Sequence, residues 1–182
     1  MKRIILASSS PRRKELLSQI VDNFEIIPAT KDEKILKCYP LTYVSCYLAK
    51  QKALEVFEKN SDSLVIGADT TVICKHQILG KPKDKEDAIR MISLLSNKTH
   101  LVVTGVYIIS KEFKKKIRCV TKVTFKKLSE KQIQDYCSLD SIYDKAGAYA
   151  IQGEAREFID HIDGDYNNVV GLPIDKIKPY LN

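Results

Sequence analysis

The fold class is decided by the stretch RIILASSSPRRKELLSQI at residues 3–20. Residues 3–7, of which the last four are apolar, predict a short buried strand. Ser10 and Pro11 then offer an N-cap and a first helical residue. Apolar residues at helical spacing follow, namely Leu16, Leu17 and Ile20. A strand that passes directly into a helix is typical of α/β folds.

The same alternation of strands and helices continues along the chain, with a loop at residues 29–40. Residues 75–77 suit a hairpin turn, which adds antiparallel pairs to the sheet. Further strands are expected at 24–27, 64–73, 101–109, 114–125 and 158–162, and further helices at 42–58, 84–95, 129–139 and from Pro173. We therefore predict a single α/β domain over residues 1–182, with a mixed sheet flanked by helices.

Length and composition exclude several classes of protein. The 182 residues are 44% hydrophobic and 29% charged, close to globular averages, so that a sizeable core is expected and disorder is not. No apolar run approaches the roughly 20 residues of a membrane-spanning helix, and residues 1–7 lack the core of a signal peptide. We expect a cytoplasmic protein without a membrane partner.

The net charge of +7 is concentrated in residues 111–131, which hold nine basic and two acidic residues. Apolar residues alternate with polar ones over 117–125, and the alternation is interrupted at Val120 and Thr121. This pattern indicates a strand with one Lys-rich face in water. Such lysines guard an edge strand against aggregation, and a polyanion-binding face is the alternative. Because no aromatic residues interleave on the basic face, we expect no nucleic-acid partner.

Five cysteines are present, an odd number without any CxxC pair, and the three histidines do not join them at zinc-finger spacing. This pattern argues against a disulfide scaffold and against structural zinc. Buried reduced thiols are the expected state of these side chains.

The first group of residues with chemical potential is Ser8 to Lys14, at the predicted strand-to-helix junction. Backbone N–H groups at a helix N-terminus attract anions, and hydroxyl and guanidinium groups add donors. Three cations beside the positive end of a helix dipole indicate an anion that they bind. The functional interpretation is a phosphate cradle, and the structural one is an ordinary capped helix.

Other candidate groups lie apart in the sequence. Asp69 interrupts an apolar strand, where aspartate is disfavoured, so that its carboxylate is expected to face a cleft or to cap a turn. Glu33 lies in an acidic loop pair that either binds metal or is simply solvated. Lys52 and Lys81 are further cations, and Gln152 follows a glycine-containing segment from which an amide can read a base edge.

Together these stretches resemble the Maf family of nucleoside triphosphate pyrophosphatases over nearly the full length of the chain. The matching segments are Leu6–Arg13, Gly67–Val72, Leu79–Asp84, Ser96–His100 with Thr104 and Gly105, Asp144–Gly153 and Asn168–Pro173. The segment DKAGAYAIQG at 144–153 is similar to the branch that acts on dTTP and UTP. The resemblance implies an elongated mixed sheet with a central substrate cleft, like that of inosine triphosphatases, and a homodimer.

The resemblance also implies the reaction and the roles of individual residues. The expected activity is hydrolysis of dTTP, UTP and modified pyrimidine nucleotides to the monophosphate and pyrophosphate, with Mg²⁺ or Mn²⁺ as the divalent metal. Asp69 would activate water and, with Glu33, hold the metal. The substrate-binding residues would be Ser8, Arg12, Arg13, Lys52 and Lys81 at the phosphates and Arg12, Thr70 and Gln152 at the base.

The chain departs from the family pattern at three positions. Ala150 replaces a glycine, Asp165 stands where serine is common, and Thr71 replaces a bulkier apolar residue. An additional carboxylate near a triphosphate would weaken binding or hold metal, which concerns substrate choice more than the reaction. Two alternatives stay open: the same chemistry on a purine or 7-methyl-GTP, and a non-catalytic regulator of septum formation or nucleic-acid binding.

Overall fold

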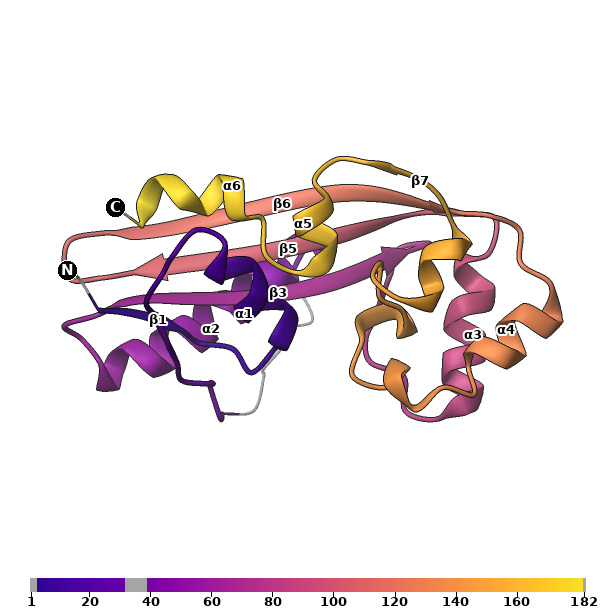
Figure 1. Cartoon of the computed structure of the whole chain (residues 1–182), viewed down its shortest axis with the longest axis horizontal. Helices are drawn as coiled ribbons and strands as arrows, with labels where there is room; N and C mark the ends of the chain where they lie inside the picture. Colours follow the sequence, from indigo (N-terminus) through magenta and orange to yellow (C-terminus); the bar gives the residue numbers. More distant parts are fainter. Residues whose placement is uncertain (1–2, 32–38, 182) are drawn as a thin grey trace. The chain divides into compact units, whose positions relative to one another are not determined.

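The computed structural model describes residues 3–31 and 39–181 (Figure 1). The chain divides into two compact units, and three long strands contribute to both of them. The first unit contains residues 1–70, 104–119 and 171–182, and the second contains residues 71–103 and 120–170. The expectation of a single domain over residues 1–182 stays a prediction.

The three shared strands are β3 (Leu64–Cys74), β5 (Thr99–Ile109) and β6 (Lys114–Phe125). The first unit adds two short strands and three helices, β1 (Ile4–Leu6), β2 (Glu25–Ile26), α1 (Pro11–Ser18), α2 (Val44–Lys59) and α6 (Ile174–Ile177). The second unit adds β4 (Gln77–Leu79), β7 (Ile159–Asp163), α3 (Lys85–Leu95), α4 (Glu130–Tyr136) and α5 (Tyr166–Val170). In this unit α3 and α4 lie side by side (Figure 1).

The strands form one seven-stranded sheet in the order β2-β1-β3-β5-β6-β7, with β4 paired to β3. β1 pairs in parallel with β2 and β3, whereas the β3–β4 and β6–β7 pairs are antiparallel. The sheet therefore contains both parallel and antiparallel pairs, and helices alternate with its strands along the chain. This confirms the predicted mixed α/β class. Lys75 and His76, both with positive φ, form the two-residue turn before β4.

Two glycines explain how closely α2 packs on the sheet of the first unit. A Cβ at Gly67 in β3 would lie 2.3 Å from the carbonyl oxygen of Ala49, and one at Gly105 in β5 would lie 2.3 Å from the nitrogen of Cys46. Any side chain at either position would therefore push the helix away from the strands. These glycines are part of the GADTT and TG sequence segments, and close helix packing is their structural reason.

Local signals in the sequence predicted several element boundaries correctly. Asp84 accepts a 2.8 Å hydrogen bond from the Asp87 nitrogen at the start of α3, and Ser129 with Gln132 forms the capping box of α4. At α1 the first helical residue is Pro11, as predicted, but the Ser10 side chain accepts no capping bond within the described residues. Ile20, expected in the apolar stripe, lies beyond the last helical residue.

Strand β6 corrects one detail of the prediction, since it has no irregularity at Val120 and Thr121. Inward and outward side chains alternate without a break, and Thr121 takes a fully buried position. Its hydroxyl donates to the Asp165 carbonyl oxygen and accepts from the Asn168 side-chain amide, which compensates for burial of a polar group. The only shift in register with β7 among the described pairs lies between Thr124 and Phe125. The outward face is basic and exposed, as predicted, at Lys114, Lys116, Arg118 and Lys122.

The cysteines of the described part are buried free thiols, as expected; Cys38 lies outside the described residues. Burial raises the pKa of the Cys46, Cys74 and Cys137 thiols, which keeps them protonated and unreactive. Within the described residues, no helix has the length and apolar content that crossing a bilayer requires.

Candidate active site

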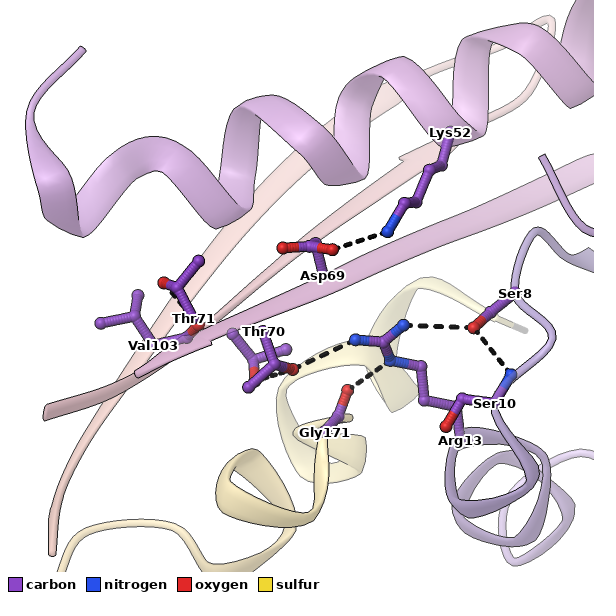
Figure 2. Close-up of polar contacts among 10 residues, drawn as sticks. Ser8, Ser10, Arg13, Lys52, Asp69, Thr70, Thr71, Val103 and Gly171 are labelled. Carbon is purple, nitrogen blue, oxygen red and sulfur yellow. Dashed lines mark hydrogen bonds and ion pairs between the residues drawn. The ribbon is translucent and has the colours of Figure 1, made fainter. Parts of the chain in front are cut away.

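The central residues of the site lie next to each other in β3 but on opposite faces of the sheet. Successive side chains of a strand point to opposite sides, so that Gly67 and Asp69 face α2 whereas Thr70 faces away from it. Figure 2 shows Asp69 directed toward Lys52 and Thr70 directed toward Arg13. The site of the first unit therefore has two sides. We call the face of the sheet with Asp69 the acidic side and the face with Thr70 the hydroxyl side.

On the acidic side, Asp69 forms an ion pair with Lys52 from α2. The Lys52 ammonium lies 2.6 Å from Asp69 Oδ1, and the two side chains are 18% and 12% exposed. The pair exists because the glycine at position 67 lets α2 approach β3. An ammonium has three donors, so that Lys52 can hold Asp69 and contact a phosphate oxygen at the same time.

On the hydroxyl side, the Arg13 guanidinium connects three segments of the first unit (Figure 2). It donates 3.1 Å to Ser8 Oγ, 3.2 Å to Thr70 Oγ1 and 3.0 Å to the Gly171 carbonyl oxygen. Thr70 Oγ1 is in turn 2.9 Å from Thr104 Oγ1. Ser8 and Arg13 were predicted as members of one group and Thr70 as part of another segment, and the structure brings these three substrate-binding candidates together.

The segment before α1 is ordered by Ser8, which is buried. Its hydroxyl accepts from the Ser10 backbone nitrogen at 3.3 Å as well as from Arg13. Arg12 is half-buried at the first turn of α1. No acidic residue occupies that turn, so the predicted excess of positive charge at this helix end is present in the structure.

Lys81 and Gln152 belong to the second unit, where both side chains are exposed. Their two segments are connected: the Gly147 nitrogen donates 2.9 Å to the carbonyl oxygen of Gly80, which precedes Lys81. The contribution of Lys81 and Gln152 to a substrate site stays a prediction. The predicted metal ligand Glu33 lies outside the described residues.

Sequence reasoning missed one residue beside this site, Glu55 of α2. Its buried carboxylate accepts from the Thr30 nitrogen at 2.8 Å, the Thr30 hydroxyl at 2.9 Å and the Lys31 nitrogen at 3.2 Å. Burial alone would raise the pKa of Glu55, but the hydrogen bonds from Thr30 and Lys31 outweigh it and hold the pKa below its usual range. Glu55 is one helical turn from Lys52, and it fixes the start of the segment that leads to Glu33.

The three departures from the family pattern have local explanations. The Thr71 hydroxyl donates to the Val103 carbonyl oxygen at 3.5 Å. The polar side chain that replaces an apolar one is therefore buried with a hydrogen-bond partner. The Ala150 backbone hydrogen-bonds the Tyr136 hydroxyl, a contact that any residue at this position can make. Asp165 accepts 3.2 Å from the Asn168 nitrogen at the start of α5, which is a capping role that serine also fills.

The site offers a buried carboxylate to a divalent metal. Among residues 3–31 and 39–181, no cluster of three or more His, Cys, Asp or Glu side chains is suited to hold a metal ion. Asp69 supplies a buried carboxylate, the hard oxygen donor that Mg²⁺ prefers. Because Mg²⁺ is bound through one or two carboxylates plus substrate phosphates and waters, this donor set fits a metal that arrives with a nucleotide.

The family model described as Maf-like protein matches residues 3–182. Proteins of Bacillus cereus (strain Q1) and Bacillus anthracis (strain CDC 684 / NRRL 3495), both named dTTP/UTP pyrophosphatase, are 48% identical over 177 residues, covering 97% of this chain and 93% of theirs. The Ham1 protein of Staphylococcus aureus has the same fold at 13% identity, with a TM-score of 0.54 over 99% of this chain and 98% of that one. The family model spans nearly the whole chain, and the chain belongs to the Maf family.

Proposed function

We propose that this protein hydrolyses dTTP, UTP and modified pyrimidine nucleoside triphosphates to the monophosphate and pyrophosphate. The observation that carries this proposal is the ion pair between Asp69, a buried carboxylate within β3, and the partly buried Lys52 of α2. A carboxylate at that position costs strand stability, which a purely binding protein has no reason to accept. The names of the Bacillus relatives support the substrate class.

In the proposed reaction, Asp69 removes a proton from water as the water oxygen attacks the α-phosphorus. A new P–O bond forms at the α-phosphorus and the bond to the α,β-bridging oxygen breaks. The bridging oxygen leaves on pyrophosphate, and the proton remains on Asp69 until it passes to solvent. Positioned general bases of this kind contribute about 10²- to 10⁴-fold to a rate.

Positive charge serves to neutralise the triphosphate in this proposal. Lys52 holds Asp69 and contacts phosphate, Arg12 and Lys81 bind phosphate oxygens, and Arg13 adds charge while it holds Ser8 and Thr70 in place. Phosphoryl transfer depends mainly on such positioning and charge neutralisation. Arg12, Thr70 and Gln152 are assigned to the choice of base.

Asp69 and Glu33 would hold Mg²⁺ or Mn²⁺ together with phosphate oxygens. When bound, the metal neutralises charge on the phosphates and orients them. Ser8 and the cations described above bind and orient the same phosphates from the protein side. The homodimer and the cytoplasmic location stay predictions, which light scattering and cell fractionation test.

The experiment that tests the function is a nucleotide panel with purified protein, with and without Mg²⁺ or Mn²⁺. Release of pyrophosphate from dTTP and UTP, with ¹⁸O from labelled water appearing in the monophosphate, is the expected result. Faster turnover of a purine nucleotide or of 7-methyl-GTP than of dTTP and UTP would show that the enzyme prefers another base. Inactivity on every nucleotide would favour a non-catalytic regulator.

A further inference from the structure

The second unit contains a buried histidine–tyrosine pair that the proposed chemistry does not use. His100 of β5 is 2% exposed, and its Nε2 lies 2.6 Å from the hydroxyl oxygen of Tyr149. The other ring nitrogen, Nδ1, is buried and has no hydrogen-bond partner within the described part of the chain. The pair joins residues 49 positions apart in sequence.

The surroundings of this pair are aromatic. The His100 ring meets the edges of Phe125 and Tyr149 at centroid distances of 5.1 and 5.4 Å, and Phe125 contacts Phe158. A phenylalanine ring would fill the place of the imidazole without burying an unpaired nitrogen. The bond to Tyr149 is therefore the feature that an imidazole supplies and a hydrocarbon ring does not.

Tyr149 belongs to the segment 146–153, which we call the glutamine loop because it carries Gln152. The backbone of this loop is strained, since Ala148 has a φ of 62° although it is not a glycine. Gly147, at φ 71°, is packed so that a Cβ would lie 3.0 Å from a Val72 methyl group. A strained backbone of this kind persists only where surrounding contacts determine it.

Three hydrogen bonds to segments distant in the sequence help to hold the glutamine loop in its strained form. The Gly147 nitrogen bonds the Gly80 carbonyl oxygen, and the Ala150 backbone bonds the Tyr136 hydroxyl. Of these three bonds, His100–Tyr149 is the one made by a side chain of the loop, and Tyr149 lies three residues before Gln152. Gln152 itself is exposed, so its position depends on the backbone that precedes it.

We propose that His100 and Tyr149 are positioning residues that set the base selectivity of the enzyme by fixing the glutamine loop and with it Gln152. This inference rests on the proposed function. A side-chain amide reads a base edge through paired donor and acceptor bonds, so that its value for selectivity depends on exact placement. Loss of the His100–Tyr149 bond is expected to lower selectivity while Asp69 and the phosphate-binding residues stay in place.

The test compares UTP with CTP in wild-type protein and in Tyr149→Phe. The two bases differ in the group at position 4, oxo or amino, and in the hydrogen on N3, so that their donor and acceptor patterns are reversed at this edge. The ratio of kcat/KM for UTP to that for CTP is expected to fall about tenfold, within the range that small misplacements cost. The ratio should fall because KM for UTP rises, while kcat for UTP stays nearly unchanged. His100→Phe should give the same ratio, and the double variant should be no worse than either single one.

Two further variants separate positioning from general stability. Tyr107→Phe removes the hydroxyl of a different buried tyrosine, which belongs to β5, and should leave the ratio unchanged. In a Gln152→Ala background, Tyr149→Phe should have no further effect on the ratio, because its action passes through Gln152. Hydrogen exchange at the amides of residues 149–152 should speed up in Tyr149→Phe and His100→Phe, which tests the loop independently of turnover.

The outcomes distinguish this inference from the proposed function. A wild-type protein inactive on all nucleotides overturns the proposed function, and the exchange measurement still decides whether the pair orders the loop. An active wild-type protein whose Tyr149→Phe variant loses thermal stability but keeps the UTP/CTP ratio overturns only this inference. Equal losses for UTP and CTP also overturn it.

Discussion

The ammonium of Lys52 lies 2.6 Å from the carboxylate of Asp69, with less than a fifth of either side chain exposed. Two opposite charges in such a place hold each other, and neither has a full water shell to replace its partner. The pair lies where α2 is brought onto β3 by the glycine at position 67. The Lys52–Asp69 ion pair therefore contributes to the stability of the fold and holds the carboxylate that we propose as the general base.

Replacing Lys52 with methionine should destabilise the fold, because it removes the ammonium that lies 2.6 Å from the buried Asp69 carboxylate. The expected loss is about 3 kcal/mol in the free energy of unfolding, measured by urea denaturation. The double variant Lys52→Met/Asp69→Asn should recover part of this loss, since it also removes the buried negative charge that Lys52 contacts. A double variant less stable than Lys52→Met would contradict the account of the pair.

Gly67→Ala should displace α2, since its Cβ would lie 2.3 Å from the Ala49 carbonyl oxygen. We expect a loss of about 2 kcal/mol in unfolding free energy together with lower activity, because Lys52 moves with the helix. The matched control is Gly80→Ala, where nothing lies within 4 Å of the added Cβ. Equal stability of these two variants would show that the close packing of α2 is not required.

Asp165 should act as a helix cap and not as a metal ligand. Its carboxylate accepts from the Asn168 nitrogen, so Asp165→Ala should lower the free energy of unfolding by about 1 kcal/mol. Asp165→Ser should retain most of that stability. Both variants should keep the wild-type metal concentration for half-maximal activity, and a clear rise in that concentration would assign Asp165 to the metal instead.

The buried His100 should make stability depend on pH in a defined window. Burial lowers its pKa from 6.5 to about 4 in the folded protein, so the unfolded chain takes up the proton first. Stability that is complete above pH 6.5 is therefore lost as the pH falls toward 4, by about 3 kcal/mol. In His100→Asn the unfolding free energy should fall less over this window; parallel curves would show that His100 is not the titrating group.

The elements with local signals could be predicted from the sequence. The caps at Asp84 and Ser129 bond backbone groups three residues away, so the sequence alone contains both partners. The positions of β3 and α2 followed from apolar periodicity in the same way. Asp69 could be identified as a candidate because aspartate within an apolar strand contradicts the local preference.

Other features depend on contacts between distant residues. Thr121 looked like an interruption of β6, and its inward position is possible only because Asp165 and Asn168 satisfy its hydroxyl. Glu55 looks like an ordinary surface residue of a helix, and only the packing of Thr30 and Lys31 against α2 makes it an anchor. No sequence spacing indicates such partners, since they come from other elements.

The most direct test of the central claim is pyrophosphate release from dTTP and UTP by Asp69→Asn compared with wild-type protein. Asparagine keeps the size of the side chain and can still accept from Lys52, but it cannot take a proton from water. We predict that wild-type protein releases pyrophosphate with Mg²⁺ or Mn²⁺ and that Asp69→Asn is slower by at least about 10²-fold, with a native circular dichroism spectrum. Turnover by Asp69→Asn near the wild-type rate would contradict the claim that Asp69 activates the water.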